Sequence, residues 1–121
     1  MRAHPGPAPS FLFVDADPRA LAALRRLVRD LPGMKRFALG VREALQLMGE
    51  AEPSVVVSSY GLPDGDGLHL LTCVRARHPG TACALHTTHP PPTRGLEARG
   101  ITWMDRAAPP QQVLELLASL G

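Results

Sequence analysis

The sequence predicts a three-layer α/β fold, in which a doubly wound parallel sheet of five strands lies between two layers of helices. Short apolar segments alternate with amphipathic helical segments along the 121 residues. The third apolar segment, at residues 54–59, is apolar on both faces, as expected for a central parallel strand covered by helices. The length and the 45% of hydrophobic residues suit one domain with a single sizeable core.

The composition of the first residues predicts a domain boundary, and the charge distribution bears on possible partners. Residues 1–9 are rich in proline and glycine, which predicts a flexible tail before a domain that spans residues 10–121. Lys and Arg number 13 against 11 Asp and Glu, and their spread gives no nucleic-acid-binding patch. Arg25, Arg26 and Arg29 cluster on a predicted helix, where a solvated face is the favoured interpretation. The apolar segments are too short to span a bilayer and no signal peptide is evident, so we expect a cytoplasmic protein without membrane contact.

The first strand and helix follow the tail. FLFVDA is an apolar run that ends at acids, which is typical of a buried strand. The next segment has an N-cap candidate, a proline in its first turn, and three apolar residues on one face. These residues are Asp17, Pro18, Leu21, Leu24 and Val28.

The second unit consists of a weak strand, MKRFAL, and a helix, GVREALQLMGEAEP. The helix places Val41, Ala44, Leu45 and Met48 on one side.

The remaining elements complete the alternation. SVVVSS predicts the third strand, and Asp66 is the N-cap candidate of the helix that follows. TACALHT and ITWM predict the fourth and fifth strands, and PPQQVLELLASLG predicts a closing helix that begins with proline. Between these strands, three prolines and Gly95 leave room for barely two helical turns.

Two cysteines and two aspartates have structural interpretations. Cys73 and Cys83 lie in apolar periodic segments, which predicts reduced core residues. Asp64 and Asp66 are predicted to act in turn and cap chemistry.

The functional site is expected beyond the carboxyl ends of the strands, near the switch in strand order, where doubly wound sheets bind their ligands. Here these ends hold residues 15–17, 59–61, 87–89 and Arg106.

Those strand ends resemble a response-regulator receiver domain, over nearly the whole chain after the first ten residues. FLFVDADP is similar to the family's first strand and acidic pair, with Asp15 as the first acid, Ala16 in place of the second, and Asp17 next. SYGLPDGDG is similar to the loop after the family's phosphoacceptor aspartate, but Ser59 stands at the acceptor position. The resemblance implies a flavodoxin-like (CheY-like) fold.

Other pocket positions follow the same resemblance. Gly61 belongs to the loop after the acceptor, and Thr87 and Thr88 end the fourth strand. Trp103 stands at the switch aromatic position, and Arg106 replaces the family's lysine three residues later.

The resemblance implies a degenerate phosphorylation pocket. In the family a carboxylate accepts the phosphoryl group while neighbouring carboxylates hold Mg²⁺, and Ala16 and Ser59 remove two of the three carboxylates. Serine is a poor nucleophile without an adjacent base. We therefore expect no catalytic residue, no metal and no cofactor, and we expect Arg106 to pair with Asp15.

The predicted function is a non-enzymatic, phosphorylation-independent interaction or regulatory module in bacterial signal transduction. Expected partners are other signalling proteins, such as a histidine kinase or an output domain, and a homodimer is a candidate assembly. The family's usual dimer surface comprises the fourth helix, fifth strand and fifth helix. The alternative is a receiver switched by an unusual acceptor, such as Asp17, or by a small ligand.

Other functional interpretations of the same residues are weaker. In a serine hydrolase built from Ser59, His86 and Asp15, the aspartate would lie on the far side of the serine from the histidine. His86 instead replaces a core aliphatic residue of the family and is expected to be a buried neutral imidazole. Metal ligation by Cys83, His86 and His89 fails because strand residues three apart point to opposite faces. A calcium loop at DGDG would need a leucine and a cysteine as ligands.

Overall fold

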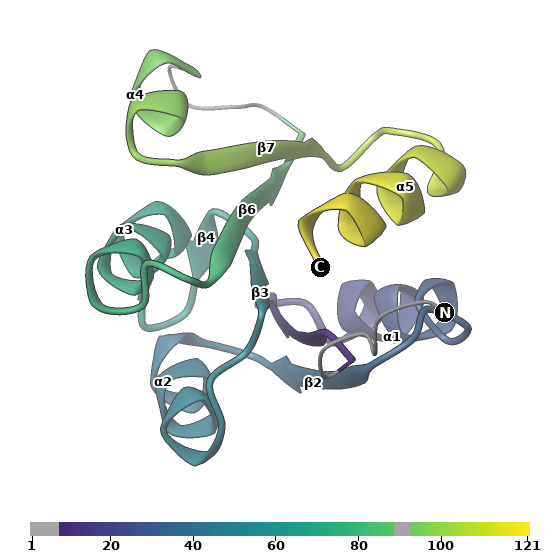
Figure 1. Ribbon diagram of the computed structural model, residues 1–121, viewed down its shortest axis with the longest axis horizontal. Helices are drawn as coiled ribbons and strands as arrows, with labels where there is room; N and C mark the ends of the chain where they lie inside the picture. Colours follow the sequence, from purple (N-terminus) through teal and green to yellow (C-terminus); the bar gives the residue numbers. More distant parts are fainter. Residues whose placement is uncertain (1–7, 89–92) are drawn as a thin grey trace, which may run out of the picture.

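The computed structural model describes residues 8–88 and 93–121. In this part of the chain, five parallel strands form one sheet in the order β2-β1-β3-β6-β7, with β3 at the centre as predicted (Figure 1). The strands are β1 (Ser10–Val14), β2 (Met34–Ala38), β3 (Val55–Ser58), β6 (Ala82–Thr87) and β7 (Ile101–Asp105). The predicted tail lies outside the described residues over positions 1–7.

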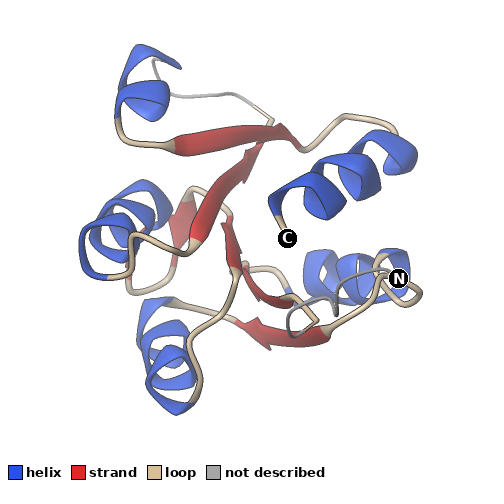
Figure 2. Cartoon of the chain, viewed as in Figure 1, coloured by secondary structure: helices blue, strands red, loops and turns tan. Residues whose placement is uncertain are grey.

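The helices cover both faces of the sheet, so the predicted three-layer α/β/α architecture is confirmed (Figure 2). One core cluster packs α1 and α5 against the sheet, and the other packs α2, α3 and α4 against the opposite face. The helices are α1 (Pro18–Leu27), α2 (Val41–Glu50), α3 (Gly67–Arg77), α4 (Thr93–Ala98) and α5 (Pro110–Leu120). Helix α4 is as short as the sequence predicts.

Helix α1 begins as its sequence predicts. The side chain of Asp17 accepts a hydrogen bond from the backbone N–H of Arg19 at 2.9 Å, and Pro18 opens the first turn. Leu21 and Leu24 are buried against the sheet. The local sequence therefore predicted correctly where this helix starts and which face packs against the sheet.

Helix α2 obtains its N-terminal cap from a distant residue. Gly40, at the N-cap position, has no side chain to offer, and Asp64 accepts hydrogen bonds from the N–H groups of Val41 at 2.7 Å and Arg42 at 2.9 Å. The bonds from Arg42 and Val41 hold the pKa of Asp64 below its ordinary value. A Cβ at Gly40 would lie 2.7 Å from Asp64 Oδ1, so glycine leaves the space that the carboxylate needs.

Asp64 lies in an antiparallel ribbon that the sequence analysis missed. Strands β4 (Gly61–Leu62) and β5 (Gly65–Asp66) form this ribbon between β3 and α3. Asp66 caps α3 as predicted, because its side chain accepts hydrogen bonds from the N–H groups of Leu68 and His69.

Two core predictions need correction. Cys73 is only partly buried, and its Sγ lies 3.7 Å from Nε2 of His69 at the surface of α3. Leu45, predicted to share the inner side of α2, is 49% exposed, whereas Ala44 and Met48 are buried. Cys83 is in the core, and burial raises the pKa of its thiol to about 11. In the described residues, no helix is long and apolar enough to cross a membrane.

Candidate functional site

The candidate site lies where the parallel strands end. The carboxyl ends of β1, β3 and β6 and the turn after β7 surround a hollow of about 340 Å³. Its lining residues are Asp15, Ser59, Tyr60, Gly61, His86, Thr87, Thr88 and Arg106. All of these residues were expected at the strand ends except His86, which was predicted to be a buried neutral imidazole. His89 lies outside the described residues.

Asp15 is the buried acid of this hollow. It is 4% exposed, and each of its carboxylate oxygens accepts a hydrogen bond. Oδ1 accepts from the backbone N–H of Asp17 at 2.9 Å, and Oδ2 accepts from Nη2 of Arg106 at 2.7 Å. The predicted pairing of Asp15 with Arg106 is confirmed, and a charge-assisted bond of this length is strong for its type.

The carbonyl of Thr87 positions two side chains of the last strand and turn. It accepts a hydrogen bond from the indole Nε1 of Trp103 at 3.0 Å and another from the backbone N–H of Arg106 at 3.2 Å. A longer contact, 3.4 Å, joins Nη1 of Arg106 to the carbonyl of His86. These contacts tie the ends of β6 and β7 together and orient Arg106 toward Asp15.

Ser59 follows β3 in a tightly folded loop. The residue is 8% exposed, and its Oγ lies 3.5 Å from the carbonyl oxygen of Gly61, a long and weak hydrogen bond. A Cβ at Gly67 would lie 1.7 Å from the carbonyl oxygen of Ser59, so only glycine permits this close approach. In residues 8–88 and 93–121, no carboxylate or imidazole accepts a hydrogen bond from Ser59 Oγ.

His86 is a buried neutral imidazole, as predicted. It is 8% exposed, and burial is the main cause that lowers its pKa to about 4. The nearby charge of Arg106 adds to this shift, while Asp15 and Asp105 oppose it. The ring is therefore uncharged at neutral pH, with no direct hydrogen bond to the serine.

The whole backbone is similar to known receiver domains. A signal receiver domain of an HD domain-containing protein from Pseudomonas fluorescens Pf-5 is 30% identical, with a TM-score of 0.86 over 98% of this chain and 90% of that one. The chain belongs to the CheY-like superfamily of receiver domains. The predicted flavodoxin-like, CheY-like fold class is thus confirmed.

Other receiver structures are similar at lower identity. The chemotaxis response regulator CheY4 of Vibrio cholerae is 22% identical, with a TM-score of 0.82 over 93% of this chain and 98% of that one. A CheY-like response regulator receiver domain protein from Methanospirillum hungatei JF-1 is 18% identical, with a TM-score of 0.83 over 92% and 91% of the two chains. No family model and no curated protein sequence matches the chain.

Two of the predicted pocket residues of this receiver domain lie outside the hollow. Ala16 and Asp17 lead into α1, where the carboxylate of Asp17 serves as the helix cap. Trp103 lies on β7 with its indole on the Thr87 carbonyl, at the edge of the site. Tyr60 lies within the range 59–61 where the site was expected, although no role was predicted for this residue.

The pocket of this receiver domain does not fit a magnesium ion. Mg²⁺ requires a near-octahedral shell of oxygen atoms that carboxylates usually anchor. Both oxygens of Asp15 already accept hydrogen bonds, Ala16 has no side-chain oxygen, and Ser59 offers a neutral hydroxyl. In the described ranges, no group of three His, Cys, Asp or Glu side chains is placed to hold a metal.

Proposed function

We propose that this receiver domain acts without phosphoryl transfer, as a protein-interaction or regulatory module of bacterial two-component signalling. The observation that carries the proposal is the contact of 2.7 Å between Arg106 and Asp15 beside a serine at the acceptor position. The guanidinium neutralises the one acid of the pocket, at the place where a metal would otherwise be needed.

The chemistry of Ser59 supports the same proposal. A serine hydroxyl needs a general base to attack phosphorus at a useful rate. The hydroxyl lies close to a backbone carbonyl, which is too weak a base for this task. His86 makes no hydrogen bond to the serine, and the pKa of about 4 that burial gives it makes the ring a weak base. Ser59 would in any case yield a stable phosphoester instead of the labile acyl phosphate of an aspartate.

Asp17 is the acceptor in the alternative function, and its contacts favour the first proposal. Its carboxylate caps α1 by accepting a hydrogen bond from the backbone N–H of Arg19. Phosphorylation of this oxygen would remove the cap and weaken the first turn of the helix. The geometry thus gives Asp17 a structural role.

A receiver domain without phosphorylation would present one constant surface. The indole of Trp103 is hydrogen-bonded to β6, which favours a single position for this side chain. The surface formed by α4, β7 and α5 would then be available to a partner at all times. We propose a signalling protein, such as a histidine kinase or an output domain, as that partner, with a homodimer as a further candidate and no nucleic acid bound.

Incubation with acetyl phosphate and Mg²⁺, followed by intact mass measurement, tests the proposal. The wild-type chain should keep its mass. The triple variant Ala16→Asp, Ser59→Asp and Arg106→Lys restores the family's pocket residues and should gain the mass of one phosphoryl group, which makes it the positive control.

Labelling of the wild-type chain would contradict the proposal. The chemical stability of the attached phosphoryl group would then identify the acceptor. Hydroxylamine cleaves an acyl phosphate on Asp17, whereas it does not cleave a phosphoester on Ser59.

A further inference from the structure

A second cavity, which shares no lining residue with the hollow at the strand ends, lies between helices α2 and α3. The two helices are neighbours on the same face of the sheet (Figure 1). The cavity has a volume of about 380 Å³, within the range of small-molecule sites. Its apolar walls are formed by Val41, Leu45, Met48, Leu70 and Val74. Leu45, at 49% exposure, leaves a large apolar side chain in contact with water at the mouth of this cavity.

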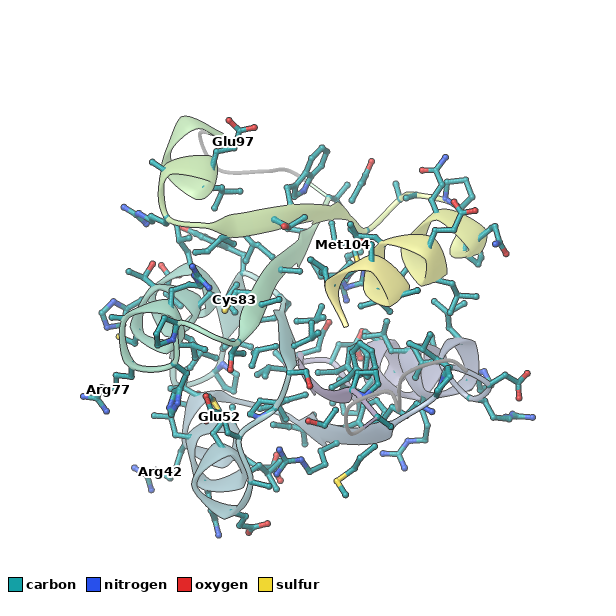
Figure 3. All side chains as sticks on the ribbon, in the orientation of Figure 1. Arg42, Glu52, Arg77, Cys83, Glu97 and Met104 are labelled. Atoms are coloured by element: carbon teal, nitrogen blue, oxygen red, sulfur yellow. The ribbon has the colours of Figure 1, made fainter. Side chains whose placement is uncertain are left out.

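The α3 side of the cavity is basic. His69, Cys73 and Arg77 follow one another at intervals of four residues and therefore share one side of the helix. No aspartate or glutamate belongs to the lining. Within the described part of the chain, the guanidinium of Arg77 has no carboxylate partner. Figure 3 shows Arg77 projecting outward from α3, on the same side of the molecule as Arg42 from α2.

Basic side chains lie at the carboxyl ends of both helices. Arg36 donates hydrogen bonds of 2.6 Å to the carbonyls of Leu47 and Ala51 at the end of α2. Arg75 donates to two carbonyls just beyond the end of α3. Arg77 is the last residue of α3, where its charge favours the negative end of the helix, and its guanidinium, which has no carboxylate partner among the described residues, is also available to an anion.

The acid next to this cavity is engaged elsewhere. Glu52 lies at one end, where its Oε1 is 3.1 Å from Nδ1 of His78 and 3.5 Å from the hydroxyl of Thr81. The carboxylate of Glu52 is therefore already in contact with His78 and Thr81. The cavity thus combines apolar walls with one unpaired positive charge.

We propose that the cavity between α2 and α3 binds a small amphipathic carboxylate, such as a medium-chain fatty acid. The hydrocarbon chain lies against the apolar walls, where burial of its surface supplies most of the affinity. The carboxylate pairs with the guanidinium of Arg77 in a charge-assisted hydrogen bond. The site is separate from the pocket at the strand ends and does not depend on whether that pocket is phosphorylated.

Alkylation of Cys73 gives a direct readout of occupancy. The chain has two cysteines, and Cys83 is 1% exposed, so one added carbamidomethyl group under native conditions reports Cys73. Decanoate is the probe and decanol is its uncharged match. Decanoate should slow alkylation in a saturable manner, and decanol should need at least several-fold higher concentration for the same protection.

Two variants and one control test the contacts. Arg77→Gln should weaken protection by decanoate to the level of decanol, while Arg29→Gln, a charge change in the turn after α1, should leave it unchanged. Leu45→Glu, at an exposed position, should abolish protection by placing a negative charge and a polar group at the mouth. Circular dichroism establishes that each variant is folded.

Three outcomes would overturn the proposal. One is an alkylation rate that decanoate does not change. Another is equal protection by decanoate and decanol in the wild type and in Arg77→Gln, which would mean that the charge plays no part. The third is an alkylation rate of Cys73 that falls as the protein concentration rises, without decanoate, which would assign the cavity to a second copy of the chain.

Discussion

The guanidinium of Arg106 lies 2.7 Å from Oδ2 of Asp15, and the two residues are 91 positions apart in the sequence. Asp15 follows β1 and Arg106 follows β7, and these strands are separated in the sheet by β3 and β6. The ion pair therefore connects the ends of two strands that are not neighbours in the sheet, in the same hollow as Ser59. The first three predictions follow from this arrangement.

The first prediction is that Asp15 and Arg106 stabilise the fold as a unit. Arg106→Ala leaves the buried carboxylate of Asp15 without its partner. Because the guanidinium is 30% exposed, solvent already screens the pair, and we expect this change to cost about 1–2 kcal/mol of unfolding free energy. The combination of Asp15→Asn with Arg106→Ala should cost less than the sum of the single changes. Denaturant melts of the four proteins give the coupling energy. Strict additivity would mean that the two residues do not interact.

The second prediction is that Mg²⁺ does not bind at the strand ends in the millimolar range. Trp103, the one tryptophan of the chain, is hydrogen-bonded to Thr87 at the edge of the pocket and reports binding there by fluorescence. We expect no saturable change on titration with Mg²⁺. A saturable change that disappears in Asp15→Asn would show that the carboxylate exchanges Arg106 for the metal.

The third prediction is that Ser59→Asp alone will take up fewer phosphoryl groups from acetyl phosphate than the triple variant Ala16→Asp, Ser59→Asp and Arg106→Lys. The single change supplies a nucleophile, but Ala16 still lacks a carboxylate for the metal and Arg106 still occupies Asp15. Intact mass over a time course compares the two variants. Equal labelling would mean that the pocket residues have been assigned to the wrong positions.

The fourth prediction concerns pH and His86. Its pKa falls from 6.5 to about 4 on folding, so the unfolded chain binds a proton in this interval that the folded chain does not. The stability that depends on the neutral ring is fully present above pH 6.5, and about 3 kcal/mol should be lost as the pH falls to about 4. In His86→Leu this part of the pH dependence should disappear. His78→Gln, at a partly exposed histidine, should retain it.

The fifth prediction concerns the cap of α2. Because its pKa is lowered on folding, Asp64 contributes stability that is present above pH 3.8 and is lost as the pH falls through the lower folded value. Asp64→Ala should therefore be less stable than the wild type at neutral pH, and the difference should shrink in acid. Asp30→Ala removes an exposed acid near the end of α1 and serves as the matched control. A constant difference at all pH values would contradict the assigned role of the carboxylate.

The sequence predicted the elements whose signals are local. Asp17 and Asp66 stand one residue before the helices they cap, and the valines of β3 are apolar on both sides. The long-range cap of α2 could not be found in this way, because Gly40 carries no capping group and Asp64 lies in another loop. Cys73 was misplaced since apolar residues surround it in sequence, while its helix neighbour at the surface, His69, is polar.

The position of the candidate site at the strand ends was predictable from the doubly wound pattern, but the roles of its residues were predictable only through the resemblance to receiver domains. The spacing of Asp15 and Arg106 in the sequence does not indicate that they meet. Their pairing was predicted because both positions match pocket positions at the strand ends of the receiver family. The position of Ser59 followed from the same resemblance. Its poor hydrogen bond to Gly61, by contrast, depends on how the ribbon of β4 and β5 folds back, which no local pattern specifies.

The cap that Asp64 gives to α2 also constrains the order in which this domain assembles. Residues 41–50 leave the ribosome before Asp64 does, so the first turn of α2 has no side-chain cap during that interval. In the folded chain β3 lies beside β1 and its loop turns back toward Gly40, so we expect the cap to form together with this strand pairing. A fragment that stops before this loop retains the sequence of α2 without the group that completes its N-terminus. The central strand and the outer helix are therefore expected to become stable together, as one folding unit.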